Sequence, residues 1–515
     1  MHARWLDLVV VLIYVLGLTG VGWRFAHRQT STDRYFTAKR AVPSWAVGLS
    51  FLAAMMTSVT FIGYPGSAYT GDWSQLVPNF FVLVALGIVG IVVIPFYRRT
   101  VGTSAFEYFG KRFGRFTRMY ASIAFAMAHF SKMALVFYLL ALTINSMTGW
   151  NMDQVILISG LLTVSYTLKG GFEAVIWTDV VQAVVIWAGI AVSLWYLLVE
   201  PPGGPAAALA LAVRHHRFSL GNTAPDLSKP TLWVMMIYGF FWYLQRYTTD
   251  QTLVQRYLAA KSDRAALRGV ALGSCLSIPV WALFMLIGTC TWTFFQLTGE
   301  KLPAHINKAD EVFPYFIGTH LPPGMAGLFM AALIGAAMCA LSSDLNAFAS
   351  VGVTDFYRQF RPDSTDRQRL AMGKVIVCVS GILAITAALI LSHTRSGALS
   401  LWYTLSAIVS GGLAGLFFLA FLSRHAIRTD AYAGIAACIA FTTWATLTEG
   451  AKPMLDLGRF NFPWHDYVIG AIGSVVLFGV GYLSRWGRRA RYFEPDATAP
   501  LRSRLRGRSR SEPRP

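Results

Sequence analysis

Residues 8–21 read LVVVLIYVLGLTGV, an apolar run without a single charged side chain. Residues 82–95, VLVALGIVGIVVIP, form a second such run. A helix in a soluble core rarely needs so many apolar residues in a row, whereas a bilayer span needs about 20. Over all 515 residues, 55% are hydrophobic and 13% are charged, well below the roughly one quarter charged that is usual in soluble domains. The sequence therefore predicts an all-α, polytopic membrane protein.

Hydropathy along the chain predicts about thirteen transmembrane helices. The longest segments between them are too short to form a soluble domain with its own core. We expect the spans at residues 5–24, 44–69, 75–97, 119–146, 154–169, 173–199, 231–249, 269–296, 324–354, 371–392, 399–422, 431–448 and 466–484.

The distribution of positive charge predicts the orientation of these spans. If the N-terminus faces outward, alternate loops face the cytoplasm, residues 169–172 and 250–268 among them. These segments hold 32 of the 44 Lys and Arg residues, and the exterior segments hold nine. Because Lys and Arg concentrate in cytoplasmic loops, we expect the N-terminus outside, the C-terminus in the cytoplasm and an odd number of spans.

The net charge of +19 does not indicate a nucleic-acid partner. Ten of the 44 basic residues follow Ser484, and most of the others lie in short loops between apolar blocks. This arrangement is typical of topology signals and not of a groove-binding patch. We expect residues 485–515 to be a basic, disordered cytoplasmic tail, with contact to anionic membrane lipid as the alternative.

Motifs for catalysis are absent from the sequence. It contains no HExxH, no GxSxG and no phosphate-binding glycine loop. The five cysteines lie in apolar segments without zinc-like spacing. We therefore predict that the protein is not an enzyme.

A polar cluster interrupts the second predicted span, where polar groups are costly and usually face a bundle interior. Residues 53–66 read AAMMTSVTFIGYPG. Thr57 and Thr60 share a helix face with Ala53 and Met56, and the glycines and proline that follow interrupt the helix. A broken helix at membrane depth exposes backbone groups for ions and substrate. A tolerated kink, with the hydroxyls bonded to their own helix, is the alternative.

Two ionisable residues lie inside other spans. Asp179, near the start of the sixth span, is a cation ligand, a proton carrier or a helix-start charge near the cytoplasmic surface. Lys132, in the fourth span, either faces a cavity or extends its ammonium to the membrane surface.

The ninth span carries a small and polar stripe. Ala336, Cys339, Ser343 and Asn346 step down one face of the helix. Small residues permit close helix packing, which is the alternative explanation. Two serines, an acid and an amide within residues 342–346 exceed what packing needs.

Several blocks resemble the sodium:solute symporter family. DRYFTAKR at 33–40, FIGYPGSAY at 61–69, WTDVVQ at 177–182 and the segments Asp250 to Lys261 and Ala331 to Tyr357 follow the family order. The resemblance covers roughly residues 30–360 and implies two inverted five-helix repeats with the substrate near the midplane. We accordingly divide the chain into an extra N-terminal helix and loop (1–43), a transport core (44–422), two peripheral helices (423–484) and the tail (485–515).

The resemblance implies a sodium site between the broken helix and the ninth span. Its ligands would be the carbonyls of Ala53, Met56 and Ala336, with two neighbouring hydroxyl side chains. This chain has Cys339 and Ala340 at those two positions. A thiol is a poor ligand for sodium and a methyl group is none.

Some family members hold a second sodium with an acid on the sixth span and serines on the ninth. All of these residues are present here as Asp179, Ser342 and Ser343. The resemblance therefore favours a carboxylate-centred cation site over the common hydroxyl site, with a proton as the alternative to sodium.

The substrate set implied by the resemblance is Thr57, Thr60, Asn79 and Lys132. The sequence is more similar to bacterial members that carry sialic acids, which have an arginine where Lys132 stands and hydroxyls where the threonines stand. A cationic side chain with hydroxyls suits a solute that bears a carboxylate. Lysine lacks the bidentate fork of arginine, so the same substrate does not follow.

The sequence thus predicts a cation-coupled symporter in a bacterial inner membrane, working by alternating access with sodium as the coupling ion. Its expected partners are a small organic, carboxylate-bearing solute and membrane lipid. The sequence leaves open whether the protein forms a homo-oligomer. A proton-coupled symporter on the same core and a transport-poor membrane sensor are the alternatives.

Overall fold

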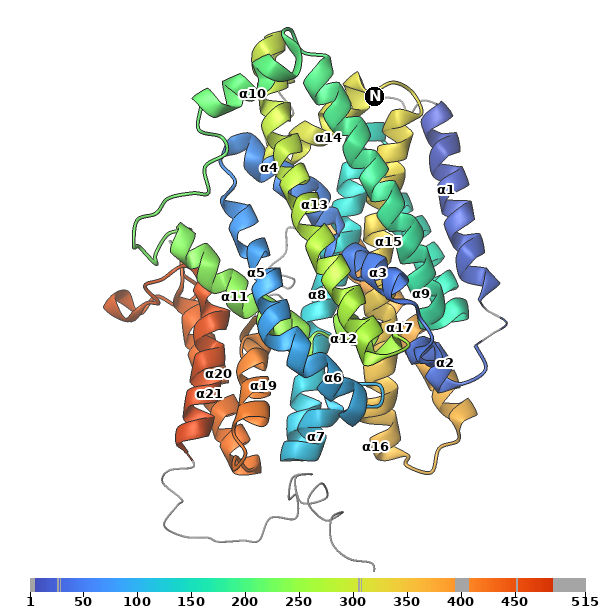
Figure 1. Cartoon of the computed structure of the whole chain (residues 1–515), viewed down its shortest axis with the longest axis vertical. Helices are drawn as coiled ribbons and strands as arrows, with labels where there is room; N and C mark the ends of the chain where they lie inside the picture. Colours follow the sequence, from blue (N-terminus) through green and yellow to red (C-terminus); the bar gives the residue numbers. More distant parts are fainter. Residues whose placement is uncertain are drawn as a thin grey trace, which may run out of the picture.

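The computed structural model describes residues 5–25, 27, 29–303, 306, 308–393, 407–450 and 453–484. Over these residues the protein is a bundle of helices without a β-strand (Figure 1). The expected all-α fold is confirmed, and the predicted tail at 485–515 lies outside the described residues.

The helices of the first half of the chain are α1 (Trp5–Arg24), α2 (Thr32–Thr37), α3 (Ser44–Met55), α4 (Ser58–Thr70), α5 (Val77–Ala85), α6 (Ile91–Thr100), α7 (Glu107–Phe113), α8 (Arg115–Thr148), α9 (Met152–Val199), α10 (Gly204–Arg214) and α11 (Leu232–Thr249). Those of the second half are α12 (Gln251–Ala259), α13 (Asp263–Thr298), α14 (Ala309–His320), α15 (Met325–Val351), α16 (Arg358–Phe360), α17 (Asp366–His393), α19 (Leu413–Leu422), α20 (Arg428–Thr448) and α21 (Ile469–Leu483).

Eight helices among the described residues are long and apolar enough to cross a membrane, and ten if each of two bent pairs counts as one span. The bent pairs are α3 with α4, and the helical segments 74–88 and 91–100. A polytopic membrane fold is therefore established, while the number thirteen stays a prediction.

The expected loop at 169–172 is present as a sharp break inside α9. Two helical segments meet there at Gly171, whose non-helical φ is 58° and ψ is −160°. A Cβ atom at Gly171 would lie 2.7 Å from Tyr35 Cδ2 and 3.0 Å from the Tyr35 carbonyl oxygen. Only glycine adopts this backbone conformation without strain and leaves room for Tyr35.

The expected loop at 250–268 is wrong over its first part. Asp250 ends α11 in an extended conformation, and the short helix α12 follows at once. All nine residues of α12 are buried, and the Arg256 side chain is fully so. Because Arg256 is buried, it is not one of the positive charges that indicate a cytoplasmic loop.

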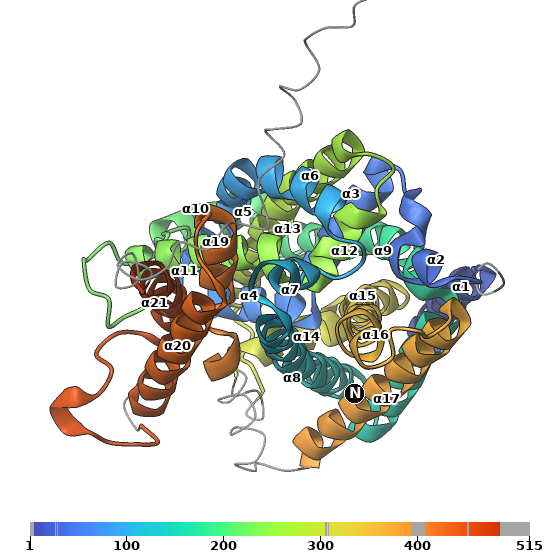
Figure 2. The same ribbon diagram turned by 90° about the horizontal axis from the view of Figure 1, so that it is seen from below.

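The two halves of the core are built alike. The first half begins with the broken pair α3 and α4, and the second begins with the broken pair α11 and α12, as expected for inverted repeats. Seen from below, α15 lies within the bundle beside α8, α9 and α17 (Figure 2). The apolar part of α15 is 83% buried, against 28% for α1.

Helices at the two ends of the chain lie on opposite sides of this core. α1 packs against α9 and α15, whereas α20 and α21 pack against each other, with α19 and α11 beside them (Figure 1). The division of the chain at residues 43, 422 and 484 stays a prediction.

Candidate functional site

The break between α3 and α4 supplies free backbone groups at the centre of the bundle. The two helices are bent by 58°, and Met56 and Thr57 between them are extended. The Met56 amide donates to the Ala53 carbonyl at 3.1 Å, and the Thr57 amide donates to Thr60 Oγ1 at 3.3 Å. The helix end and helix start that meet here leave further carbonyls and amides without intrahelical partners. The break that we predicted at this point is therefore present, two turns earlier than its glycines and proline.

The second break has an acid at its centre. Asp250 caps α12, because its Oδ1 accepts from the Thr252 amide at 2.9 Å. Its Oδ2 accepts from Arg246 Nε at 3.2 Å, one turn back on α11. A side-chain cap and an ion pair thus hold the chain where the helix is interrupted.

Asp179 on α9 is paired with a cation from the protein itself. Arg256 Nη2 on α12 donates to Asp179 Oδ2 at 2.7 Å, and both side chains are fully buried. Ser50 Oγ on α3 donates to the same carboxylate oxygen at 2.6 Å. Sequence reasoning identified Asp179 but missed Arg256.

Arg256 links four helices. Besides Asp179, its guanidinium donates to the Ser50 carbonyl at 3.0 Å, to the Thr252 carbonyl at 2.6 Å and to Ser343 Oγ on α15 at 2.7 Å. A buried guanidinium is stable only when its donors are satisfied in this way. The bonds connect one half of each broken helix, α3 and α12, to α9 and α15.

The buried polar atoms beside this pair form a candidate cation site. Asp179 Oδ1, the Tyr14 hydroxyl and both amide atoms of Gln182 are buried and have no hydrogen-bond partner among the described residues. Ser342 Oγ donates to the Cys339 carbonyl at 3.1 Å and also lies in hydrogen-bond contact with the Tyr166 hydroxyl. Hard oxygen donors around a carboxylate suit sodium, so these residues fit the coupling ion that the sequence indicated.

The common sodium site has weaker chemistry. Ala53, Met56, Ala336 and Cys339 are all buried beside the first break or on α15. The Ala53 carbonyl already accepts the Met56 amide, and the thiol and methyl side chains of Cys339 and Ala340 add no oxygen. This part of the structure therefore offers carbonyl oxygens alone.

Three of the four expected substrate residues lie on or beside α4, the second helix of the first broken pair. Thr57 and Thr60 meet at the start of α4. Asn79 on α5 donates to the Tyr64 hydroxyl at 2.8 Å and accepts from the Tyr243 hydroxyl at 2.7 Å. Asn79 therefore connects α4, α5 and α11, because its side-chain amide forms hydrogen bonds with two tyrosine hydroxyls.

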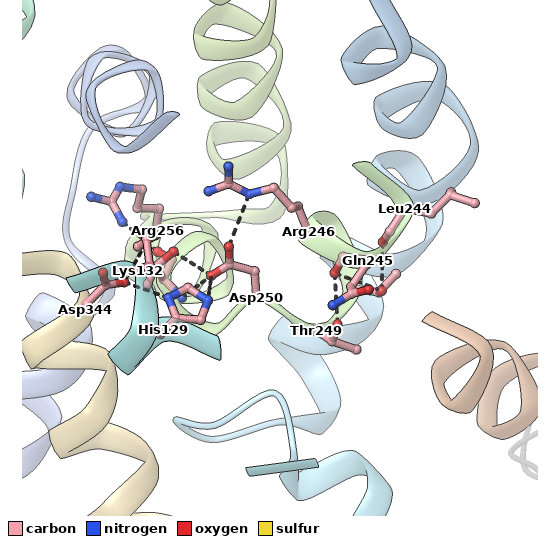
Figure 3. Close-up of polar contacts among 11 residues, drawn as sticks. His129, Lys132, Leu244, Gln245, Arg246, Thr249, Asp250, Arg256 and Asp344 are labelled. Carbon is pink, nitrogen blue, oxygen red and sulfur yellow. Dashed lines mark hydrogen bonds and ion pairs between the residues drawn. The ribbon is translucent and has the colours of Figure 1, made fainter. Parts of the chain in front are cut away.

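Lys132 on α8 forms an ion pair with an acidic residue of α15. Its Nζ lies 2.8 Å from Asp344 Oδ1 on α15 (Figure 3). Ser58 Oγ, at the start of α4, donates to the Val136 carbonyl at 3.2 Å, one turn beyond Lys132, so the lysine lies close to the first break. The Lys132 side chain is 31% exposed, whereas that of Asp344 is fully buried. Lys132 is thus the more exposed member of the pair.

A chain of charged groups continues from this pair to the second break (Figure 3). His129 Nδ1 lies 2.7 Å from Asp344 Oδ1, and His129 Nε2 lies 3.7 Å from Asp250 Oδ1. Arg246 completes the chain on the far side of Asp250. Sequence reasoning noted Asp344 but missed the others; the only signal was Asp250 in a helix-capping position before Thr252.

The comparisons with known proteins identify the family of this chain. The model of the sodium:solute symporter family matches residues 35–437. The chain is 30% identical to the sodium/sialic acid symporter NanT of Aliivibrio fischeri, over 93% of this chain and 92% of the relative. It is 30% identical to the sodium/sialic acid symporter SiaT of Proteus mirabilis, over 84% and 87%.

A solved structure agrees over almost the whole chain. A sodium-coupled sialic acid symporter, in a substrate-bound outward-open state, superposes with a TM-score of 0.86 at 29% identity, covering 93% of this chain and 98% of that one. The family model spans both broken helices and α15, the elements that carry the buried polar groups. This chain therefore belongs to the sodium:solute symporter family and is a sodium-coupled secondary transporter, not an enzyme.

Proposed function

We propose that this protein imports a small organic solute that bears a carboxylate, of the chemical class to which sialic acids belong. The observation that carries the proposal is Lys132, a lysine with a partly exposed side chain beside the break between α3 and α4. Relatives of similar length are sialic acid symporters. The hydroxyls of Thr57 and Thr60 and the amide of Asn79 supply the polar partners that such a solute requires.

The coupling sodium is assigned to Asp179 with Ser342 and Ser343. The carboxylate supplies the negative charge, and its Oδ1 is directed away from Arg256 and Ser50 as an available donor. One charge that moves through 100 mV releases about 2.3 kcal/mol, so a single sodium ion supports useful accumulation of the solute. The site at Ala53, Met56, Ala336 and Cys339 is the weaker one.

Sodium-driven uptake tests this function directly. Purified protein in liposomes should accumulate radiolabelled sialic acid under an inward sodium gradient and lose it when the gradient is collapsed. A thermal-shift screen of sugars, organic acids and amino acids, with and without sodium, identifies the solute if sialic acid is not carried. A protein that binds solute without accumulating it would instead be a sensor.

The proposed location is the bacterial inner membrane, with the N-terminus outside and the C-terminus in the cytoplasm. The concentration of Lys and Arg in the predicted cytoplasmic segments supports this orientation, and it holds after Arg256 is removed from the count. A reporter fused after Arg491 should be cytoplasmic and one fused within 205–225 should be exterior. Both reporters on one side would contradict the orientation.

A further inference from the structure

A crevice of about 430 Å³ opens on the surface of the bundle, beside the end of α15. Its walls come from α8, from α16 and α17, and from the π-helical turn Gly352–Tyr357 that follows α15. Seen from below, α16 lies close to both α8 and α17 (Figure 2). Nine of the ten residues that line the crevice are uncharged, and Arg361 is the tenth. The crevice is therefore an apolar surface with one cation at its edge.

The lining is apolar because the acid of the π-helical turn points into the protein. Asp355 is fully buried, and its carboxylate accepts from Arg118 Nε at 2.6 Å and from Ser104 Oγ at 2.6 Å. The next two residues, Phe356 and Tyr357, line the crevice. Successive helical residues point in different directions, so this turn buries its carboxylate and presents aromatic rings on the other side.

The helix surfaces that flank the crevice are those of a lipid-facing wall. α8 and α17 are both candidate membrane spans. Ile123 on α8, one turn from the lining residue Ala126, is 43% exposed, and Val375 on α17, next to the lining residue Ile376, is 53% exposed. Exposed apolar side chains on a membrane span contact acyl chains. A lipid chain can therefore enter the crevice from the bilayer.

Two guanidinium groups stand at the edge of the crevice. Arg361 lines it, and the Arg115 guanidinium carbon lies 4.6 Å from the centroid of the Phe360 ring, which also lines it. Neither arginine forms an ion pair within the part of the chain that the structure describes. Residues 358–369 carry four arginines and two aspartates, and one of these acids, Asp366, accepts hydrogen bonds from α2. Guanidinium donors without a carboxylate partner suit a phosphate group.

The position of the crevice along the membrane normal favours a phospholipid as the source of that phosphate. α16 and α7 lie at the same end of the bundle (Figure 1), and the proposed orientation places this end at the cytoplasm. The cytoplasmic leaflet contains the anionic lipids that attract Lys and Arg near the membrane surface. A free phosphate would match the arginines but not the apolar lining, and a zwitterionic lipid would match the lining but brings its own cation.

We propose that this crevice binds one anionic phospholipid. An acyl chain lies between Ala126 of α8 and Met372 of α17, and the phosphate lies between Arg115 and Arg361. The lipid thereby joins the ends of α8 and α17, and it stabilises the folded protein in proportion to its occupancy. The site is separate from the solute and sodium sites and does not depend on which solute is carried. The proposed orientation enters only as the source of the anionic lipid.

Native mass spectrometry of the purified full-length transporter tests the proposal, because it counts the lipids that the protein retains. Phosphatidylglycerol and phosphatidylcholine with identical acyl chains are added at increasing concentration. Arg115→Gln with Arg361→Gln removes the two cations, and Ala126→Phe fills the crevice. The matched control is Arg424→Gln with Arg428→Gln, which removes two exposed arginines just before and at the start of α20. Glycerol phosphate is the competitor that has the phosphate but no acyl chain.

The parent protein should retain one phosphatidylglycerol molecule more tightly than phosphatidylcholine. Loss of Arg115 and Arg361 should weaken the binding of phosphatidylglycerol about 30-fold and change that of phosphatidylcholine little. Ala126→Phe should weaken the binding of both lipids, and the control should match the parent. Melting temperatures without lipid check that each variant is folded. If Ala126→Phe does not fold, the two arginine double variants decide the question.

Three results would overturn the proposal. The preference for phosphatidylglycerol could persist without Arg115 and Arg361, which would place the lipid elsewhere. Both double variants could lose it equally, which would assign the preference to net charge. Glycerol phosphate could displace the lipid at equal concentration, which would identify a phosphate site. None of these results concerns sodium-driven uptake, so each would leave the proposed function intact.

Discussion

Arg256 and Asp179 form a fully buried ion pair at 2.7 Å at the position where the sequence placed a cation site. The pair joins α12, the second helix of the broken pair α11 and α12, to α9. It leaves Asp179 Oδ1 without a hydrogen-bond partner among the described residues. If the coupling ion binds Asp179 as proposed, the guanidinium and the ion share one carboxylate, which links the position of a broken helix to ion binding.

Arg256→Gln should destabilise the sodium-free protein and strengthen its response to sodium. Removal of one partner from a buried pair costs about 3–5 kcal/mol, because the other charge stays behind. Sodium should then recover part of the loss, since it becomes the only cation on Asp179. Thermal unfolding as a function of sodium concentration measures this. Arg246→Gln is the control, because it removes a guanidinium that pairs with Asp250 instead. Equal sodium responses in both variants would contradict the shared carboxylate.

Lys132→Ala should weaken solute binding strongly, whereas Lys132→Arg should retain part of it. Loss of one member of a desolvated charge pair costs about 2–5 kcal/mol, which corresponds to roughly 30-fold or more in affinity. Arginine preserves the charge but changes its geometry. The dissociation constant for the solute at saturating sodium is the measurement. If the alanine variant binds with unchanged affinity, Lys132 serves only to pair with Asp344.

Long apolar runs and the family blocks were enough to predict the membrane fold and the first broken helix. The second break could not be predicted in the same way. Residues 250–259 contain Asp250, Gln251, Gln255 and Arg256, which in one dimension resemble a polar loop. Their burial depends on partners far along the chain, Asp179 and Ser343 above all. Hydropathy averages over neighbours in sequence and does not register such pairs.

The candidate site was predicted residue by residue where the family pattern applies. Asp179, Ser342, Ser343, Thr57 and Lys132 became candidates in this way, and their roles stay predictions. His129 was not, because a lone histidine in an apolar span has no spacing that marks it. Only the fold brings it within 2.7 Å of Asp344 and 3.7 Å of Asp250.

Gly171→Ala should lower the thermal stability of the protein. The residue has a positive φ of 58°, and a Cβ atom there would meet the Tyr35 side chain and carbonyl. Left-handed backbone strain of this kind costs roughly 1–3 kcal/mol, before the steric conflict is counted. Gly20→Ala in α1 is the matched control, since no atom lies within 4 Å of its added Cβ. A decrease of equal size in both variants would contradict the explanation.

Asp310→Asn should stabilise the protein at neutral pH and flatten the dependence of its stability on pH. Asp310, on α14 outside the candidate spans, lies against Gly66 of α4, and burial raises the pKa of its carboxyl group. A raised pKa means that the folded state binds this proton more tightly than the unfolded state does. The group therefore favours folding more as the pH falls through its folded-state pKa. Melting temperatures of both proteins between pH 4 and about pH 8 should converge at the acid end and separate toward neutrality.

Asp179→Asn should abolish sodium-driven uptake. The substitution keeps the size of the side chain and removes the charge that the coupling ion needs, while exchange of solute across the membrane need not stop. Cys339→Ala should reduce the sodium dependence far less, because a thiol contributes little to a sodium site. The measurement is uptake against sodium concentration at two pH values in liposomes. Normal coupling in Asp179→Asn together with its loss in Cys339→Ala would reverse the assignment of the two sites.

The combined substitution Cys339→Ser with Ala340→Ser tests the same assignment by adding ligands to the common sodium site. It restores the two hydroxyl groups that the common sodium site requires beside the carbonyls of Ala53, Met56 and Ala336. If the ligand chemistry alone weakens that site, the double variant should gain a second sodium and show a steeper dependence of uptake on sodium concentration. Cys378→Ser on α17 is the control for a thiol-to-hydroxyl change elsewhere. An unchanged sodium dependence in the double variant would mean that the carbonyl geometry, and not the absence of hydroxyls, keeps the ion out. Uptake that followed pH and ignored sodium in the parent protein would identify Asp179 as a proton carrier.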